Sequence, residues 1–326
     1  MYLSFDLGGT NIKAGIIDKM GNIIIKQSLP TAENKDVDEI LQQFIEISKT
    51  LLAKAKLNQQ EIQGVGVGLP GFIEADKGLV IKAPNLGWEN IHIKQKLEGL
   101  LPYPVFLSND ANAAALGEMW KGAGQGCKDL LCLTLGTGVG GGVIIGGQIY
   151  NGRYGLAGEI GHFQVNPHEG RKCNCAKIGC LETESSASAL IFYGECAVKK
   201  GEKTVLAEIM KKKKKLTGRD VTETALHGDK VALEIITNAA YYLGFALANI
   251  YTVVAPQKII IGGGLAGAGD VLFKPIIKWF NNFSFENIKG EEIIFPAKLG
   301  NDAGIVGLAK LIEQGVKNHA KNSCLD

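Results

Sequence analysis

The sequence predicts an α/β protein built from two domains that share one topology. Its 326 residues suit two domains at about 150 residues each. Apolar strand patterns and amphipathic helix patterns alternate along the chain, as they do in α/β folds. A glycine-rich turn with a threonine, followed by an apolar strand, occurs in both FDLGGTNIKAGIID (5–18) and LTLGTGVGGGVIIG (133–146). This self-similarity indicates a duplicated domain, although two unrelated glycine-rich hairpins would also look alike.

The first part of the chain is predicted to begin as a β-meander. Apolar strands over residues 2–7 and 12–17 flank GGTN, and a third strand, IIIKQSL, follows the turn at DKMGN. Apolar residues then recur at spacings of three and four, which predicts a helix over residues 36–56. The next predicted elements are strands over 62–71 and 103–110 and a helix over ANAAALGEMW, 111–120.

The second part of the chain opens in the same way, with strand, glycine turn, strand, glycine turn and strand over residues 129–150. More helix follows than in the first part. The predicted elements are helical segments over 184–215 and 229–250, a strand over 258–264, a helix over 269–282, a strand over 291–297 and a closing helix from Gly304.

One apolar run, residues 235–257, is long enough to span a bilayer. Two Asn, two Thr and Pro256 interrupt it, and only its first two thirds has a helical pattern. We therefore predict a buried helix followed by a strand rather than a membrane span. Asp6 lies inside the first apolar run, which argues against a signal peptide. We expect a cytoplasmic protein.

Charge and cysteine content exclude several classes of protein. The net charge of +2 provides no general attraction to nucleic acid or to a membrane surface. The run KKKKK (211–215) is predicted to be a solvated helix end, because no aromatic or further basic cluster accompanies it. Seven Cys is an odd count, which does not suit the disulfide framework of a small secreted protein.

Glycine-rich turns bring backbone N–H groups close to an anion, because no Cβ stands in the way. DLGGTN (6–11) is one candidate phosphate loop, in which Asp6 could reach a magnesium ion and Thr10 could donate to a phosphate oxygen. LGTGVGGG (135–142) supplies a second threonine in a similar loop. The residues assigned to nucleotide binding are Asp6, Gly8, Gly9, Thr10, Asn11, Lys13, Gly136, Thr137, Gly138, Gly263 and Gly264.

The pattern G-x-G-x-x-G, typical of dinucleotide binding, needs a strand before it and a helix after it. A strand follows the match within LGTGVGGG, so that match does not indicate a dinucleotide-binding site. GGGLAG (262–267) is flanked by a strand and a helix, but no acidic residue stands clearly at the end of the next strand. A loop that packs against the adenosine of ATP agrees better with the two earlier phosphate loops than an NAD site does.

SNDAN (108–112) lies where a predicted strand turns into a helix. Asp110 could simply cap that helix, which is a common role of Asp at such a junction. It could also accept the hydroxyl proton in phosphoryl transfer to an alcohol, a reaction that otherwise needs positioning and charge stabilisation. The residues alone do not choose between these roles.

The spacing C-x-C-x4-C in CNCAKIGC (173–180) indicates a zinc site, since structural zinc takes four sulfur or nitrogen ligands. Either His162 or His168 could complete a Cys3His set. Three reduced thiols without a ligand, or a redox pair, are the alternatives. The third Cys and the nearby His argue against both.

Six motifs occur in the order seen in the ROK family of sugar kinases and repressors, which the chain resembles: DLGGTN, SNDANAAALGE, LGTGVGGG, GEIGH, CNCAKIGCLE and IIIGGG. The resemblance runs from residue 4 to residue 307 or so. It implies the actin-like ATPase fold of two ribonuclease-H-like domains, with ATP and sugar in an interdomain cleft. We expect a small N-terminal domain over 1–115 plus 304–326, and a large domain carrying the zinc loop over 116–303.

The resemblance also implies roles for single residues. The general base of the family corresponds to Asp110 and its neighbouring sugar ligand to Asn109. The implied zinc ligands are His162, Cys173, Cys175 and Cys180. The expected substrate ligands are Gly71, Asn85, Asn109, Asp110, Glu159, His162 and Glu182, although Asn85 could be an ordinary turn residue. The family commonly has Gly after the second Cys, and Ala176 at this position predicts a slightly different loop backbone.

The function implied is an ATP- and magnesium-dependent kinase that transfers the γ-phosphoryl group to the 6-hydroxyl of a hexose. APNLGW and GLAGEIGH resemble the glucokinase branch and favour glucose. Kinases of N-acetylmannosamine or of another amino sugar or hexose are the alternative, and polyphosphate or ADP could replace ATP as the donor. The resemblance implies a homodimer or homotetramer, with no nucleic-acid or membrane partner.

Two other classes of function are weighed against the kinase. A sugar-responsive repressor is a remote alternative, because the phosphate loop begins at Asp6 and leaves no room before it for a helix-turn-helix module. A zinc-organised binding module without catalysis would need neither two phosphate loops nor a carboxylate at a strand end.

Overall fold

The structure is a computed structural model that describes residues 1–322. Residues 323–326, which include Cys324 and the end of the predicted domain segment 304–326, lie outside the described residues. The chain divides into two compact units. Unit 1 comprises Met1–Lys128, Gly142–Gly158 and Leu299–Asp326, and unit 2 comprises Asp129–Gly141 and Glu159–Lys298. The domain boundaries placed after residues 115 and 303 from the sequence stay a prediction.

Unit 1 contains a five-stranded sheet with the strand order β3-β2-β1-β4-β8. Its strands are β1 (Tyr2–Leu7), β2 (Asn11–Ile17), β3 (Ile23–Pro30), β4 (Val65–Leu69) and β8 (Val105–Asn109). The first three strands pair antiparallel as the predicted meander, whereas β1, β4 and β8 run parallel. Because parallel strands end at the same edge of a sheet, Asp6 and Asn109 both lie near the carboxyl edge.

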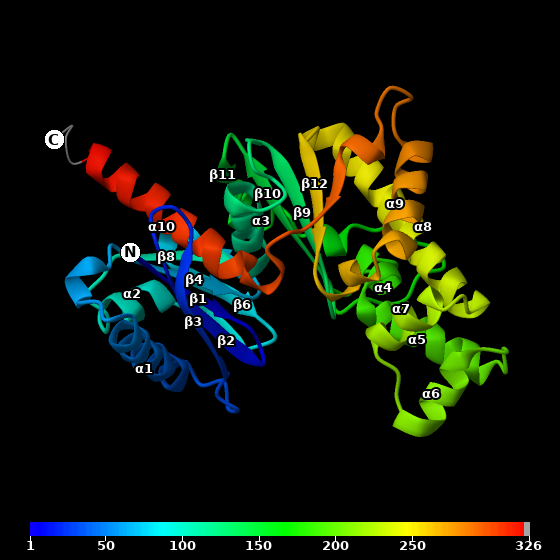
Figure 1. The fold of residues 1–326 in the computed structure, drawn as a ribbon, viewed down its shortest axis with the longest axis horizontal. Helices are drawn as coiled ribbons and strands as arrows, with labels where there is room; N and C mark the ends of the chain where they lie inside the picture. Colours follow the sequence, from blue (N-terminus) through cyan, green and yellow to red (C-terminus); the bar gives the residue numbers. More distant parts are fainter. Residues whose placement is uncertain (323–326) are drawn as a thin grey trace. The chain divides into compact units, whose positions relative to one another are not determined.

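Helices cover both faces of this sheet (Figure 1). Helix α1 (Val37–Ala55) packs on one face, where Phe44 stacks on Phe5 with ring centroids 4.5 Å apart. Helix α10 (Ala303–Asn322) packs on the other face, against β1, β4 and β8, and also against α3 (Asp110–Lys121). Side chains alternate along a strand, so Asp6 points to the face opposite Phe5, toward α10.

A small antiparallel sheet of order β5-β6-β7 lies between β4 and β8 in the chain. The strands are β5 (Phe72–Glu74), β6 (Leu79–Ala83) and β7 (Trp88–Ile91), and α2 (Ile93–Glu98) follows them. The sequence patterns did not predict this sheet, whose strands are only three to five residues long. Its β6–β7 connection carries APNLGW, so the sheet holds a predicted substrate loop.

The second five-stranded sheet repeats the plan of the first and has the order β11-β10-β9-β12-β13. Its strands are β9 (Leu130–Leu135), β10 (Val139–Ile145), β11 (Gln148–Ile149), β12 (Lys258–Gly262) and β13 (Ile294–Pro296). As β1, β4 and β8 do in the first sheet, β9, β12 and β13 run parallel. The predicted α/β duplication is therefore confirmed by the shared strand order.

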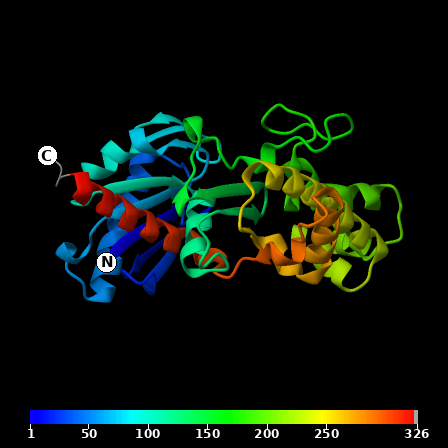
Figure 2. The same ribbon diagram turned by 90° about the horizontal axis from the view of Figure 1, so that it is seen from above.

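Helices make up most of the remainder of unit 2. They are α4 (Leu181–Ser185), α5 (Ala187–Lys199), α6 (Val205–Lys213), α7 (Gly218–Leu226), α8 (Lys230–Val254) and α9 (Asp270–Phe283). Helix α8 packs against α9, α4, α7 and α5, and Figure 2 shows α8 and α9 side by side in yellow and orange. Short 3-10 helices occur at Gln59–Glu61, Ala75–Lys77, Arg153–Gly155, Ile160–His162, Gly264–Ala268, Gly290–Glu292 and Gly300–Asp302.

The long apolar run over 235–257 forms one continuous helix, so the strand predicted for its last third is wrong. Helix α8 continues to Val254 and ends at Ala255, the residue before Pro256, where a proline disfavours helical backbone. Tyr251 packs edge-on against Phe280 of α9, which keeps the last turns helical. Among residues 1–322, α8 is the one helix long and apolar enough to cross a membrane by length and composition. Since 56% of the most apolar 18-residue stretch of α8 is buried, α8 is a core helix.

The crossing of α3 and α10 depends on two glycines. A Cβ on Gly307 would overlap the carbonyl oxygen of Ala113, and one on Gly117 would overlap that of Ala303. We predict that Gly307→Ala lowers the free energy of unfolding by about 2 kcal/mol or more, because a packed crossing cannot admit the methyl group. The matched control is Gly194→Ala in α5, where the nearest atoms are side-chain methyls, starting with one of Leu216 at 3.1 Å.

The check is urea unfolding of both variants. Alanine favours helix by up to about 1 kcal/mol over glycine, so Gly194→Ala should unfold close to the wild type. Equal stability of the two variants would contradict the role assigned to the crossing.

Candidate functional site

The turn Gly8–Asn11, which joins β1 to β2, is held from behind by Thr31. The Gly8 N–H donates to the Asn11 carbonyl oxygen at 2.9 Å, which closes the turn. Thr31 Oγ1 donates to the Gly8 carbonyl oxygen at 2.8 Å, and the Thr31 N–H donates to the Thr10 carbonyl oxygen at 2.9 Å. The predicted phosphate turn is thus a fixed loop at the carboxyl edge of the sheet. Thr31 was not among the residues predicted from the sequence.

Asp6 is a half-buried carboxyl group at the end of β1. A Cβ placed on Gly304 would lie 2.6 Å from Asp6 Oδ2, so the first turn of α10 leaves room for the carboxyl only because this residue is glycine. Burial, together with the charge of Asp110, raises the pKa of Asp6 to about 7, while the charge of Lys13 opposes the shift. Lys13 Nζ donates to the carbonyl oxygen of Asn301, just before α10.

Asn109 and Asp110 occupy different positions at the start of α3, and only Asn109 is the N-cap. Asn109 is the N-cap: its Oδ1 accepts from the N–H groups of Ala111 at 2.9 Å and Asn112 at 3.2 Å. Asp110 is the first helical residue, and burial raises the pKa of its carboxyl group. Capping therefore falls to Asn109. The Asp110 Oδ1 accepts a further hydrogen bond from the Ala111 N–H at 2.8 Å.

Two other predicted substrate residues of unit 1 lie on loops beside this edge. Asn109 Nδ2 donates to the carbonyl oxygen of Gly71 at 3.1 Å, which ties the turn after β4 to the start of α3. Asn85 is exposed on the β6–β7 loop, and a Cβ on Gly9 would lie 3.6 Å from its Cβ. The Asn85 carbonyl oxygen accepts from Lys35 Nζ at 2.7 Å. The structure thus brings the phosphate turn and the APNLGW loop together.

In unit 2, Glu182 connects two groups of predicted residues. The loop Gly136–Gly138 after β9 is closed by a hydrogen bond from the Gly136 N–H to the Gly138 carbonyl oxygen at 3.0 Å. Glu182 Oε2 accepts from the Val139 N–H at 3.1 Å, and a Cβ on Gly138 would overlap this oxygen. The predicted sugar ligand therefore bonds the backbone of the predicted phosphate loop.

The remaining residues of the nucleotide set surround the same loop. The carbonyl oxygen of Thr137 accepts from Ser188 Oγ at 2.7 Å. Gly263 follows β12 and packs directly on the backbone of Leu135, at the end of β9. No atom lies within 4 Å of a Cβ placed on Gly264, so this position is open.

Four predicted metal ligands of unit 2 converge on one point. The ligand atoms of His162, Cys173, Cys175 and Cys180 lie within 4.8 Å of one another. Cys173 Sγ is 3.5 Å from His162 Nδ1, and Cys175 Sγ is 3.5 Å from Cys180 Sγ. These separations suit neighbouring corners of a tetrahedron with zinc bonds of about 2.0 to 2.3 Å. His168 is not a member of the cluster.

The chemistry of the cluster also fits a soft metal ion. Burial and the neighbouring thiols raise the pKa of Cys180 to about 12, so this group ionises only beside a strong cation. The Cys173 N–H donates to the Lys177 carbonyl oxygen and closes a tight turn around Ala176. Ala176 has a φ of 73°, in the left-handed region where the family commonly has Gly. Ala176 thus adopts a conformation that glycine adopts more easily, and the backbone difference expected from the family stays a prediction.

His162 faces two groups at once. Its Nδ1 points to the thiol cluster, whereas its Nε2 lies 4.0 Å from Glu159 Oε2. This separation is longer than a hydrogen bond, so Glu159 lies next to His162 as a neighbouring carboxylate that does not bond the ring.

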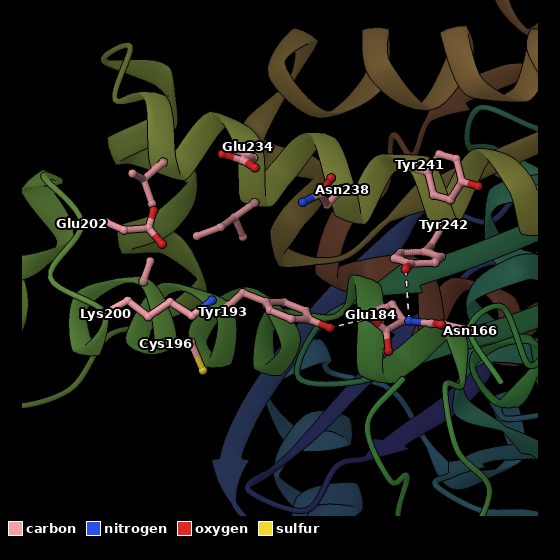
Figure 3. Close-up of a pocket in the computed structure, with 13 residues that line it drawn as sticks. Asn166, Glu184, Tyr193, Cys196, Lys200, Glu202, Glu234, Asn238, Tyr241 and Tyr242 are labelled. Carbon is pink, nitrogen blue, oxygen red and sulfur yellow. Dashed lines mark hydrogen bonds between the residues drawn. The ribbon is translucent and has the colours of Figure 1, made fainter. Parts of the chain in front are cut away.

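A pocket with a volume of about 500 Å³ lies elsewhere in unit 2, between α5 and α8 (Figure 3). None of the predicted site residues lines it. Tyr193 donates to Glu184 Oε2 at 2.5 Å, and Ser185 Oγ donates to the Ala239 carbonyl oxygen at 2.9 Å. These bonds fix α4, the short helix that carries Glu182.

Comparison with known proteins places the chain among sugar kinases and related regulators. The profile of the ROK family matches residues 2–315. A glucokinase from Halalkalibacterium halodurans is 42% identical, covering 96% of this chain and 95% of that protein. A solved ROK family glucokinase from Streptomyces griseus, in complex with glucose and AMPPNP, is 34% identical, covering 96% and 99% of the two chains with a TM-score of 0.78. A xylose repressor from Caldicellulosiruptor bescii is 30% identical, covering 95% of this chain and 77% of that protein.

The raised pKa of Asp6 predicts a dependence of stability on pH. With a folded pKa of about 7 against an ordinary value of 3.8, the folded chain binds this proton more tightly than the unfolded chain. The stability due to protonation is complete below 3.8 and is lost as pH rises through 7. We expect Asp6→Asn to raise the melting temperature clearly at pH 8 and much less at pH 5. Thermal unfolding at both pH values is the measurement, and an equal shift at both would contradict burial as the cause.

Proposed function

The chain belongs to the ROK family, and from that premise we propose that it is an ATP-dependent glucokinase, which transfers the γ-phosphoryl group of ATP to the 6-hydroxyl of glucose. The observation that carries this proposal is the half-buried carboxyl of Asp110, whose pKa is raised and which leaves the N-cap position of α3 to Asn109. Relatives named glucokinase, one of them solved with glucose and AMPPNP, support glucose and ATP as the substrates.

Asp110 acts in this proposal as the general base. A general base works best when its pKa approaches the operating pH, and burial moves the pKa of Asp110 in that direction. The ionised carboxylate accepts the proton of the sugar 6-hydroxyl as that oxygen attacks the γ-phosphorus atom. The bond to the bridging oxygen breaks, and ADP leaves with that oxygen. No covalent intermediate on the protein is required.

The remaining predicted residues bind and orient the substrates. Gly71, Asn85 and Asn109 of unit 1 and Glu159, His162 and Glu182 of unit 2 are the proposed sugar ligands. The turn Gly8–Asn11 with Lys13 and the loop Gly136–Gly138 are proposed to bind phosphates through backbone N–H and threonine hydroxyl groups. Gly263 and Gly264 are proposed to face the adenosine. A magnesium ion bound with ATP would neutralise phosphate charge, and ionised Asp6 is its proposed protein neighbour.

The thiol cluster is proposed to hold a structural zinc ion through His162, Cys173, Cys175 and Cys180. Four sulfur and nitrogen ligands fill a tetrahedral site and leave no open position for catalysis. The ion would fix the loop that begins with Glu159 and ends at Glu182, on either side of the cluster. We further propose a cytoplasmic homodimer or homotetramer, with the domain boundaries after residues 115 and 303 that the resemblance implies.

Replacement of Asp110 tests the assigned base. We predict that Asp110→Asn lowers kcat by a factor of about 10² to 10⁴, the usual contribution of a general base, while the melting temperature changes little. Asp270→Asn is the matched control, since Asp270 is also the first residue of a helix and its side chain is 79% exposed. The assay couples ADP release to glucose, mannose, fructose, N-acetylglucosamine and N-acetylmannosamine in turn.

The sugar panel separates the alternatives. Preference for glucose is the expected result, and preference for an acetylated sugar would assign the chain to amino-sugar kinases with the same mechanism. Substantial turnover by Asp110→Asn would remove Asp110 from the role of base. Inactivity of the wild type with every sugar would contradict the kinase proposal with ATP as donor.

The zinc proposal is tested by metal content. We predict that the purified wild type carries about one zinc ion per chain, and that Cys175→Ala loses it and melts at a lower temperature, because three ligands hold structural zinc poorly. Cys196→Ala in α5, outside the cluster, is the control and should keep the metal. Elemental analysis by mass spectrometry gives the answer. Retention of zinc by Cys175→Ala would contradict the ligand set.

A further inference from the structure

We propose that Lys35 is a positioning residue for sugar binding, because it holds the loop that carries Asn85 in place beside the phosphate turn. The segment Thr31–Lys35, between β3 and α1, contacts both loops, and nothing in the sequence motifs assigns it a role. The inference rests on the proposed function for its effect on glucose, but the contacts themselves do not depend on it.

One end of the segment is fixed to the phosphate turn. Thr31 is buried and bonds both Gly8 and Thr10 through its hydroxyl and its N–H group. Just past the other end, Asp36 caps α1, since its side chain accepts from the N–H groups of Asp38 and Glu39. The segment between these two points spans four residues, which leaves Lys35 little freedom to shift.

Lys35 donates one hydrogen bond to the β6–β7 loop and accepts another from the first residue of β7. Its Nζ donates to the carbonyl oxygen of Asn85 at 2.7 Å. Its own carbonyl oxygen accepts from the indole Nε1 of Trp88 at 2.7 Å. Trp88 is buried and begins β7, so the second bond fixes Lys35 to a rigid element. The first bond then fixes Asn85 to Lys35.

The backbone of Lys35 is also unusual. Its φ of 53° lies in the left-handed region, which a residue with a Cβ adopts only at a cost in free energy. Strained backbone of this kind persists where the surrounding contacts determine it, and it is often found near functional sites. Here three hydrogen bonds surround it: the Lys35 N–H donates to the Ala32 carbonyl oxygen at 3.0 Å, and Lys35 also bonds Asn85 and Trp88.

The hydrogen bonds of Lys35 determine where Asn85 lies. The Asn85 main chain lies against Gly9, 3.6 Å from where a Cβ on that glycine would be. Three segments of unit 1 therefore each contact the other two: the turn Gly8–Asn11, the segment Thr31–Lys35 and the β6–β7 loop. If Asn85 binds the sugar, loss of the Lys35 bond releases it in the ground state and the transition state alike. Such a loss raises KM and leaves kcat nearly unchanged.

The test compares Lys35→Met with Lys35→Arg and with a control, Lys56→Met. Lys56 is a second lysine with left-handed backbone, at a φ of 55°, and it is the C-cap at the far end of α1. We expect Lys35→Met to raise KM for glucose about 5- to 20-fold with less than a twofold change in kcat and in KM for ATP. Lys35→Arg should recover part of the loss, and Lys56→Met should match the wild type.

Hydrogen exchange without substrates provides a readout that does not need activity. In Lys35→Met, the backbone amides of residues 85–88 should exchange several times faster than in the wild type and in Lys56→Met. Unchanged exchange would contradict the claim that Lys35 holds the β6–β7 loop in place. Faster exchange with an unchanged KM for glucose, in an active enzyme, would overturn the role of Lys35 in sugar binding. A wild type inactive on every sugar would contradict both the proposed function and the role of Lys35 in sugar binding. Hydrogen exchange would still show whether Lys35 holds the β6–β7 loop in place.

Discussion

Two half-buried carboxyl groups, Asp6 and Asp110, are the constraint around which unit 1 is organised. A carboxylate taken out of water loses hydration, and a second carboxylate nearby also repels it. Loss of hydration raises the pKa of both groups, and the charge of Asp110 raises the pKa of Asp6 further. The surrounding structure makes the arrangement tolerable: Gly304 leaves room for Asp6, Lys13 lies near enough to oppose its pKa shift, and Asn109 caps α3. This arrangement supports the roles proposed for the two groups, Asp6 beside magnesium and Asp110 as the base.

In unit 2, the loop from Glu159 to Glu182 has few apolar side chains from which to build a core. Between Glu159 and Glu182 the chain forms only a short 3-10 helix and isolated bridges, at Gln164–Cys180 and Lys172–Ile178. Side chains that meet at one point take the place of a core. The thiol cluster holds the middle of the loop, and the bond from the Val139 N–H to Glu182 holds its end. In the proposed zinc-bound protein, metal ligands would position this loop more than hydrophobic packing does.

Residues without a motif connect the residues that have one. Thr31 and Lys35 join the phosphate turn to the β6–β7 loop, and Glu184 and Ser185 fasten α4 to its neighbours. Each of these contacts is a hydrogen bond between segments far apart in the chain. Their common effect is to restrict how far a functional side chain can move, which matters because small displacements of reacting groups reduce rates steeply.

The sequence by itself determined the features that local chemistry encodes. Alternation of apolar residues, glycine turns and the repeated opening predicted the α/β class, the duplication and most strands and helices. The spacing of three Cys predicted a soft-metal cluster, because ligand type and loop length restrict what can converge. Tertiary structure decided what depends on partners distant in the chain. Helix α8 continues where the sequence pattern predicted a strand, and its last turns pack on α9 through Tyr251 and Phe280. The spacing of the motif left His162 and His168 open, the family resemblance favoured His162, and the fold confirms His162 at the thiols. Only the fold could give the capping role to Asn109 and place Lys35 against Asn85, because each depends on where other groups lie in space.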